Sequence, residues 1–179
     1  MNIRPLLEQF SSLPRFPDGR INYTGSDKAL VLTCFVMYED RILLLKRSDK
    51  VGSYRGKWNS VAGFVDEPVP IEDKILEELR EELGISPDMI GGIKVGKPYE
   101  FHDAYIKKTW LIIPCLARLE REQEIKLDWE HTDYAWIDPE RIGYYDTVAN
   151  LEESLRIALD EVGPCEQGPT SAQEDGLSC

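Results

Sequence analysis

The sequence predicts an α/β protein in which one mixed β-sheet is covered on two sides by helices. Two observations lead to this fold class: several short apolar stretches have the pattern of strands, and one amphipathic helix interrupts them while another follows them. The chain has 179 residues, of which 42% are hydrophobic and 30% charged. That length and composition suit one globular domain with short extensions, which can bury a core without disulfides or structural metals.

Six short apolar stretches are expected to form strands, namely residues 30–38, 42–45, 58–62, 93–99, 109–119 and 133–137. Glu39 and Asp40 separate the first two stretches, which predicts a hairpin. The third stretch follows a loop rich in Gly, Ser and Tyr. Pro114 lies inside the fifth stretch, and because proline cannot donate to a strand ladder, it favours an edge strand or a bulge there.

Two helices follow from apolar residues at helical spacing. Pro70 suits the first turn of the clearer helix, and Gly84 is its expected stop. The apolar positions of this helix are Ile71, Ile75, Leu76, Leu79 and Leu83. The last helix is marked by Leu151, Leu155, Ala158, Leu159 and Val162.

The composition divides the chain into three regions. Residues 1–28 contain several prolines and glycines and are expected to form an N-terminal extension wrapped onto the domain. Residues 29–162 are expected to form the folded domain. Residues 163–179, rich in Gly, Pro, Ser, Gln and acids, are expected to be a disordered acidic tail.

The sequence also predicts a compartment. No stretch approaches the ~20 apolar residues of a transmembrane helix, and the first twenty residues lack the apolar core of a signal peptide. The four cysteines form no CxxC pair, so a zinc site or a redox motif is not indicated. These observations predict a cytoplasmic protein.

The net charge restricts the partners. The chain carries 33 acidic and 21 basic residues, for a net charge of −12. Such a surface repels nucleic acids and anionic membranes, so neither is an expected partner. Residues 66–82 hold eight acids against two bases, and residues 160–179 hold five acids and no base. A small phosphorylated substrate remains compatible with this charge if a metal ion stands between the two sets of negative groups.

Four carboxylates lie within six residues of the clearer helix, at Glu77, Glu78, Glu81 and Glu82. Like charges four residues apart destabilise a helix by about 0.2–0.5 kcal/mol per pair, so a compensating partner is expected. At about 100° per residue, Glu78 and Glu82 border the apolar face of the helix. Carboxylates held together at such an edge favour Mg²⁺ or Mn²⁺, whereas the alternative is a solvated acidic face.

This region resembles the Nudix box, which the family writes as G-x5-E-x7-R-E-U-x-E-E-x-G-U, with U a bulky aliphatic residue. The positions that match at the right spacing are Gly63, Glu78, Leu79, Glu81, Glu82, Gly84 and Ile85. Val69 stands where the first Glu belongs, and Glu77 stands where the Arg belongs. Gly56-Lys57-Trp58 is similar to the lead-in of the family. The resemblance spans about residues 29–162 and implies a Nudix-like α/β/α sandwich with a mixed sheet.

The resemblance also implies a chemistry. Enzymes of this family cleave a diphosphate linked to a moiety X by attack of water on phosphorus, with divalent metal. Carried over by position, Glu78, Glu81 and Glu82 would bind Mg²⁺ (or Mn²⁺), helped by a backbone carbonyl near Ala62 or Gly63. Glu78 or Glu81 would act as the general base. In the family, the missing Glu and Arg mainly brace the loop and the helix.

Further site residues are candidates by position. Glu130 precedes Trp136 by six residues and is a candidate for the acid that family members often supply from a later loop, the alternative being a surface glutamate. Arg47, Arg55 and Lys57 are candidates for holding outer phosphates, the alternative being an ordinary charged rim. His131 is expected to be a hydrogen-bonding residue of the loop, the alternative being a role in substrate binding or proton transfer.

The leading hypothesis is a Mg²⁺-dependent hydrolase that cleaves a diphosphate linkage in a nucleoside diphosphate derivative or a nucleotide. Val69 and Glu77 motivate an alternative, a catalytically silent Nudix domain that binds a nucleotide or a protein partner. A Nudix-fold isomerase of isoprenoid diphosphates is disfavoured because Cys34 and Cys115 both lie in apolar runs. The expected partner is a small phosphorylated substrate, and a homodimer is left open.

Overall fold

One mixed sheet organises residues 1–160, which are the residues that the computed structural model describes. The strand order is β3-β2-β1-β7-β5, with β4 beside β1, β6 beside β7 and β8 beside β2. The sheet is mixed because β1 and β7 run parallel while the other pairs are antiparallel. The strands are β1 (Lys28–Tyr38), β2 (Arg41–Arg47), β3 (Trp58–Asn59), β4 (Val61–Phe64), β5 (Ile90–Val95), β6 (Tyr99–Asp103), β7 (Lys108–Leu119) and β8 (His131–Ile137).

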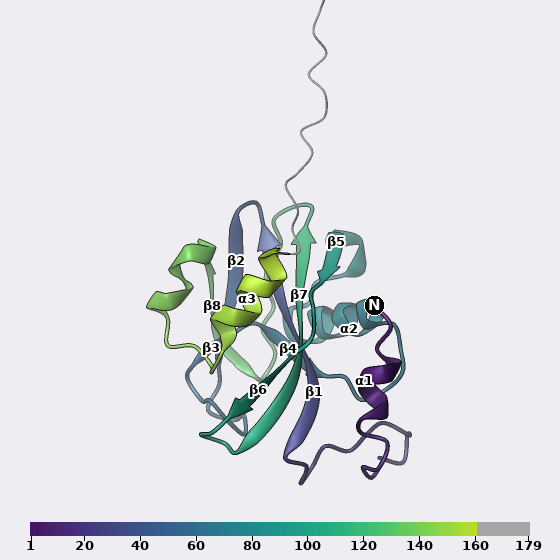
Figure 1. The fold of residues 1–179 in the computed structure, drawn as a ribbon. Helices are drawn as coiled ribbons and strands as arrows, with labels where there is room; N and C mark the ends of the chain where they lie inside the picture. Colours follow the sequence, from purple (N-terminus) through teal and green to yellow (C-terminus); the bar gives the residue numbers. More distant parts are fainter. Residues whose placement is uncertain (161–179) are drawn as a thin grey trace, which may run out of the picture.

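Helices cover both faces of this sheet (Figure 1). The apolar side of α2 (Ile71–Leu83) packs on one face, and α3 (Leu151–Asp160) packs on the other. A short helix, α1 (Arg4–Glu8), lies near the N-terminus, and two 3₁₀ segments span Pro87–Met89 and Pro139–Tyr144. The predicted α/β sandwich with a mixed sheet is therefore confirmed.

The side chains of each strand point alternately to the two faces of the sheet, and this produces two hydrophobic cores. In β1, Cys34 and Val36 belong to the core under α2, whereas Phe35 and Met37 belong to the core under α3. The side chains of successive residues in a strand point to opposite faces, so a strand with both faces covered is apolar throughout. The predicted hairpin is present, with Met37 opposite Ile42, and Glu39 takes the left-handed conformation (φ 51°) in its turn.

Two predicted strands are each divided in the structure. The stretch 58–62 forms β3, which pairs with β2, and β4, which pairs with β1, on either side of Ser60. The stretch 93–99 forms the ends of β5 and β6, which both pair with β7. Apolar periodicity does not reveal where a strand changes partner, because the residues on both sides of the change remain buried.

Of the two alternatives predicted for Pro114, an edge strand or a bulge, the edge position is wrong. Pro114 lies in β7, which pairs with β1 on one side and with β5 and β6 on the other. The proline is tolerated because it falls opposite the break between β5 and β6, where the Gly96 amide donates to the Pro114 carbonyl (2.8 Å).

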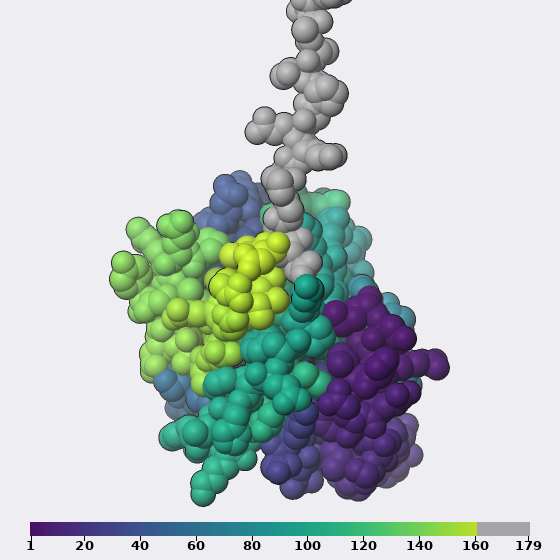
Figure 2. All heavy atoms as spheres, viewed as in Figure 1, coloured from purple at the N-terminus to yellow at the C-terminus, as the bar shows by residue number. Residues whose placement is uncertain are grey.

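The N-terminal extension packs tightly onto the domain. Figure 2 shows residues 1–28, in purple, along one flank of the molecule. Five apolar side chains of this extension are buried in the same core as α2, namely Ile3, Leu7, Phe10, Ile21 and Tyr23. The division at residue 28 stays a prediction, and the predicted tail at 163–179, like Val162, lies outside the described residues.

Within residues 1–160, no helix is long and apolar enough to cross a bilayer. Cys34 and Cys115 are buried free thiols, as expected from the apolar runs that contain them.

Candidate active site

Helix α2 carries the carboxylates, and its two ends are defined by backbone conformation. Pro70 precedes the first helical residue as the N-cap in an extended conformation (ψ 135°), and Gly84 ends the helix in the left-handed region (φ 68°). Ile75 and Leu79 are fully buried against the sheet. Since Glu78 and Glu82 border this apolar face, they are carried to the sheet edge instead of into solvent.

Glu82 is the most buried of the four carboxylates, with 5% of its surface exposed. Its Oε1 accepts a hydrogen bond from the Ala62 amide (3.4 Å), while its buried Oε2 has no hydrogen-bond partner. The His131 Nε2 lies 3.8 Å from Oε2, and burial lowers the pKa of His131, which favours the neutral imidazole. Burial, together with the charges of Glu78 and Glu130, raises the pKa of Glu82 well above its usual value. An unpaired buried carboxylate of this kind is costly unless it gains a partner.

Glu78 lies against the backbone of β4. A Cβ on Gly63 would overlap the Glu78 carboxylate, so glycine leaves the space that this side chain fills. Burial raises the pKa of Glu78 to about 7, and the neighbouring Lys74 acts against that rise. Glu81, by contrast, is exposed.

Glu130 joins the buried carboxylates from the turn before β8. The Ser48 amide donates to the Glu130 carbonyl (2.7 Å), and the Glu130 amide donates to Asp128 Oδ1 (3.0 Å), which fixes the turn. Burial and the charge of Asp128 raise the pKa of Glu130. His131 hydrogen-bonds Asp128 (3.1 Å) as expected, although it is the first residue of β8 and not part of the loop. The charges of Glu78 and Glu130 each act on the buried Glu82 carboxylate, so Glu82 links the three carboxylates.

Among the predicted basic residues, only Arg47 belongs to this cluster. It ends β2, and its Nε donates to the Ser53 carbonyl (3.1 Å). Burial lowers the pKa of Arg47, while the charges of Glu130 and Glu82 oppose that change.

Arg55 and Lys57 line a neighbouring open hollow instead. The Arg55 Nε donates to the Val51 carbonyl (2.9 Å), and Lys57 pairs with Asp146. The structure therefore does not bring these two residues to the carboxylates.

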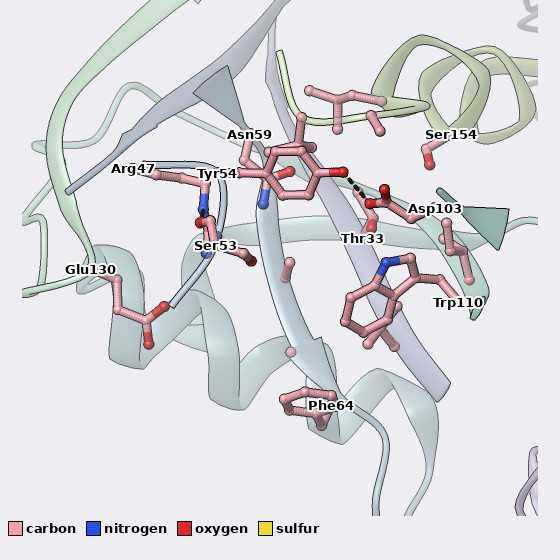
Figure 3. Close-up of a pocket in the computed structure, with 17 residues that line it drawn as sticks. Thr33, Arg47, Ser53, Tyr54, Asn59, Phe64, Asp103, Trp110, Glu130 and Ser154 are labelled. Atoms are coloured by element: carbon pink, nitrogen blue, oxygen red, sulfur yellow. Dashed lines mark hydrogen bonds between the residues drawn. The ribbon is translucent and has the colours of Figure 1, made fainter. Parts of the chain in front are cut away.

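A cavity of about 270 Å³ adjoins the carboxylates (Figure 3). Arg47 and Glu130 lie at one end of it, and Phe64 and Trp110, with ring centroids 6.4 Å apart, lie at the other. The Tyr54 hydroxyl donates to Asp103 Oδ2 across its wall. Polar side chains that sequence reasoning missed also line this cavity, namely Thr33, Ser53, Tyr54, Asn59, Asp103 and Ser154.

Within the described residues, no three His, Cys, Asp or Glu side chains form a preassembled metal site. The donors present nevertheless fit a hard divalent cation: they are carboxylate oxygens, and one of them, Glu82 Oε2, is buried without a partner.

Comparison with known proteins shows which family this chain belongs to. A family model described as the NUDIX domain matches residues 28–158. The chain belongs to the Nudix family. It is 31% identical over 127 residues to the nucleoside triphosphatase NudI of Escherichia coli, a match covering 64% of this chain and 85% of that protein. These relatives bear out the prediction of a Nudix-type pyrophosphohydrolase.

Solved structures of the Nudix family share the fold. The MutT protein from Methanosarcina mazei is 22% identical with a TM-score of 0.59, over 72% of this chain and 91% of that chain. The NUDIX domain of NrtR from Shewanella oneidensis, solved with ADP ribose, is 15% identical with a TM-score of 0.61, over 89% and 99% of the two chains.

The two departures from the Nudix box have different surroundings. Val69 is partly buried in the loop before α2. Glu77 accepts a hydrogen bond from Lys74 Nζ (2.6 Å), which lies one turn earlier on the same helix. Sequence reasoning missed Lys74, although it is one of only two bases among eight acids in residues 66–82.

Proposed function

We propose that this Nudix enzyme hydrolyses a diphosphate linkage in a nucleotide or a nucleoside diphosphate derivative with Mg²⁺ (or Mn²⁺), and that nucleoside triphosphates are its first candidates. The observation that carries the proposal is the buried, unpartnered Oε2 of Glu82 beside the carboxylates of Glu78 and Glu130. Their mutual repulsion is relieved when a divalent cation binds among them. The similarity to NudI supports the choice of substrate class.

The proposed metal-holding groups all present oxygen: the carboxylates of Glu78, Glu81, Glu82 and Glu130, and a backbone carbonyl of Ala62 or Gly63. A bound divalent ion would neutralise phosphate oxygens and lower the pKa of water. Glu81 is exposed, so it is proposed to reach the ion from the solvent side. Glu82 supplies the buried side and Glu130 the loop side.

Glu78 is the favoured general base, and Glu81 is the alternative. Burial raises the pKa of Glu78 to about 7 in the absence of metal, and its carboxylate lies against the Gly63 backbone, whereas Glu81 is exposed. The Glu78 carboxylate would accept the proton of the attacking water on an oxygen that faces the substrate.

The cavity supports an orientation for the substrate. Arg47, at the carboxylate end, is proposed to bind the outer phosphates through its planar guanidinium. Phe64 and Trp110, at the other end, are proposed to contact the base. The cavity of about 270 Å³ shares Ser53, Tyr54 and Asp103 with the neighbouring hollow of about 730 Å³, so its own volume sets no limit on the size of the substrate. Arg55 and Lys57 are proposed to contact only parts of a substrate that extend into the neighbouring hollow.

The test is a panel of nucleoside triphosphates, nucleoside diphosphates, nucleoside diphosphate sugars and dinucleoside polyphosphates, incubated with Mg²⁺ and separately with EDTA. We expect phosphate or pyrophosphate to be released from at least one nucleoside triphosphate, with Mg²⁺ and not with EDTA. No product from any compound, combined with nucleotide-induced stabilisation without metal, would instead support the silent binding domain.

Two further properties are proposed on the sequence alone. The cytoplasmic location predicted from the sequence stays a proposal. A homodimer remains open, and light scattering on the purified chain decides it.

A further inference from the structure

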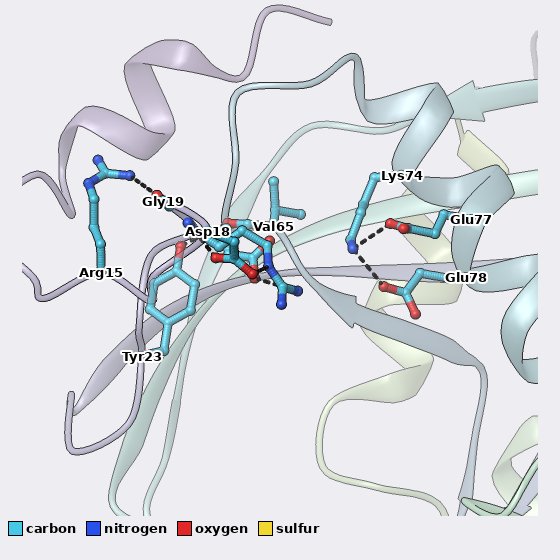
Figure 4. Close-up of polar contacts among 10 residues, drawn as sticks. Arg15, Asp18, Gly19, Tyr23, Val65, Lys74, Glu77 and Glu78 are labelled. Carbon is cyan, nitrogen blue, oxygen red and sulfur yellow. Dashed lines mark hydrogen bonds and ion pairs between the residues drawn. The ribbon is translucent and has the colours of Figure 1, made fainter.

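Lys74 occupies an unusual position for a lysine. It lies in the second turn of α2 with only 8% of its surface exposed. Lysine is seldom buried unless it is paired. Its Nζ lies 2.6 Å from Glu77 Oε2 and 3.4 Å from Glu78 Oε1, as Figure 4 shows. The ammonium is therefore held inside the carboxylate cluster instead of in solvent.

The same oxygen of Glu78 is confined from the other side. A Cβ on Gly63 would overlap Glu78 Oε1, so the β4 backbone and the Lys74 ammonium enclose this atom between them. A long, flexible glutamate side chain has several rotamers available, and two contacts on one oxygen select among them.

Asp66 extends the arrangement into the loop before α2. Its Oδ1 is buried without a hydrogen-bond partner, and its Oδ2 lies 3.7 Å from Arg20 Nη1. The charges of Lys74 and Arg20 both favour the ionised form of Asp66 against the effect of burial. The Ile21 amide donates to the Asp66 carbonyl (2.8 Å). Lys74 thus faces carboxylates on the helix and on the loop, and the N-terminal extension holds that loop from outside.

We propose that Lys74 is a positioning residue that holds the Glu78 carboxylate against the Gly63 backbone, ready to bind the divalent cation. The Nudix box has an Arg at the position of Glu77. In this chain the positive charge lies one helical turn earlier, on Lys74. The inference rests on the proposed metal-binding role of Glu78, and its metal-binding part is tested without substrate because the hold on Glu78 acts before any substrate arrives.

Two other roles for Lys74 make different predictions. If Lys74 competed with the cation for Glu78, removing its charge would strengthen metal binding. If Lys74 were only a stabilising ion pair, its removal would lower the melting temperature and leave metal affinity unchanged. A positioning role predicts weaker metal binding in a protein that remains folded.

The experiment measures Mn²⁺ binding by electron paramagnetic resonance in the full chain, without substrate. The variants are Lys74→Met, Lys74→Arg and, as a matched control for loss of one positive charge, Lys97→Met at an exposed lysine between β5 and β6. We expect Lys74→Met to weaken Mn²⁺ binding about ten-fold, Lys74→Arg to recover most of that loss, and Lys97→Met to match the wild type. If Lys74→Met fails to fold, Lys74→Gln replaces it with the same expectation.

The kinetic part uses the best substrate of the panel. We expect Lys74→Met to lower kcat and to raise the Mg²⁺ concentration needed for half-maximal rate, with little change in KM for the nucleotide. Mn²⁺ binding by Lys74→Met or Lys74→Gln that is as tight as in the wild type, or tighter, overturns the inference. A wild type that binds Mn²⁺ but turns over no substrate refutes the proposed function alone.

Discussion

At the scale of single residues, the carboxylate site depends on a position that has no side chain. Gly63 lies in β4, and its hydrogen is what allows the Glu78 carboxylate to lie directly on the backbone. The same residue opens the Nudix box, so the requirement for glycine here has a steric cause. The strand conformation itself does not demand it, since Gly63 is not among the glycines with positive φ.

Gly63→Ala is therefore expected to displace Glu78 and to lower kcat about 100-fold, because a misplacement of about 1 Å in an active site costs that much. The melting temperature should change by only a few degrees, since the obstructed group is the end of a flexible side chain. Steady-state kinetics and thermal unfolding measure the two effects.

The matched control is Gly92→Ala in β5, where an added Cβ meets nothing within 4 Å. It should leave kcat unchanged. Equal activity of Gly63→Ala and the wild type would contradict the placement of Glu78 in the site.

The surroundings of a single residue could be predicted from the sequence only when the residues that it contacts are close to it along the chain. Helical geometry predicted that Glu82 borders the packed face, and the structure buries it. The contact between Tyr54 and Asp103 joins residues 49 positions apart, and no local pattern indicates it. The sequence showed Lys74 only as one of two basic residues in an acidic segment. Its burial could not be predicted, because it depends on how the loop before α2 packs against the helix.

At the scale of elements, the loop between β2 and β3 forms one wall of the cavity. Tyr54 in this loop takes a left-handed conformation (φ 55°) and donates its hydroxyl to Asp103 at the end of β6. A non-glycine residue in that region is strained and persists only when its surroundings hold it. This hydrogen bond is therefore well placed to keep the wall in position.

Removing the bond with Tyr54→Phe is expected to raise KM for the nucleotide about ten-fold while kcat stays within about three-fold. A hydrogen bond to a charged acceptor contributes about 1.5–3 kcal/mol, and this one lies beside the cavity and not among the metal-binding carboxylates.

Tyr105→Phe serves as the control, because Tyr105 is 83% exposed and its ring lies 6.0 Å from that of Tyr54. Its KM should match the wild type. A fall in kcat with unchanged KM in Tyr54→Phe would contradict this assignment of the loop.

The elements themselves were largely predictable, and their interruptions were not. Strand and helix periodicities located the hairpin after β1, helix α2 and its stop at Gly84. The breaks at Ser60 and between β5 and β6 arise because neighbouring segments pair with different strands or leave a gap in the ladder. Which strand a segment pairs with depends on the arrangement of the whole sheet, so a local apolar pattern cannot reveal these breaks.

At the scale of the whole molecule, the net charge of −12 includes buried carboxylates whose ionisation opposes folding in the absence of metal. The pKa of Glu78 in the folded protein is about 7, above its ordinary value of 4.5. Between these pH values the folded state keeps a proton that the unfolded state has released. The stabilisation that the protonated Glu78 contributes to the folded state is fully present below pH 4.5 and is lost as the pH rises to about 7.

Glu78→Gln removes this titration, so in EDTA the variant should gain stability relative to the wild type as the pH rises from 5 to 8, by an amount on the order of 2 kcal/mol. Urea unfolding at the two pH values measures the difference, in which the titrating groups that do not interact with Glu78 cancel. In the presence of Mg²⁺, the wild type should instead be more stable than Glu78→Gln. A variant-minus-wild-type difference that does not change with pH would contradict the burial of an ionisable Glu78.

The central claim is that the buried Glu82 carboxylate serves a metal-dependent hydrolysis. The most direct measurement compares phosphate or pyrophosphate release from a nucleoside triphosphate by the wild type and by Glu82→Gln, at equal protein and saturating Mg²⁺. The account predicts a loss of at least about 100-fold in Glu82→Gln, with a melting temperature in EDTA no lower than the wild type's, because glutamine relieves an unpaired buried charge. Equal rates in the two proteins, or wild-type turnover that persists in EDTA, would contradict it.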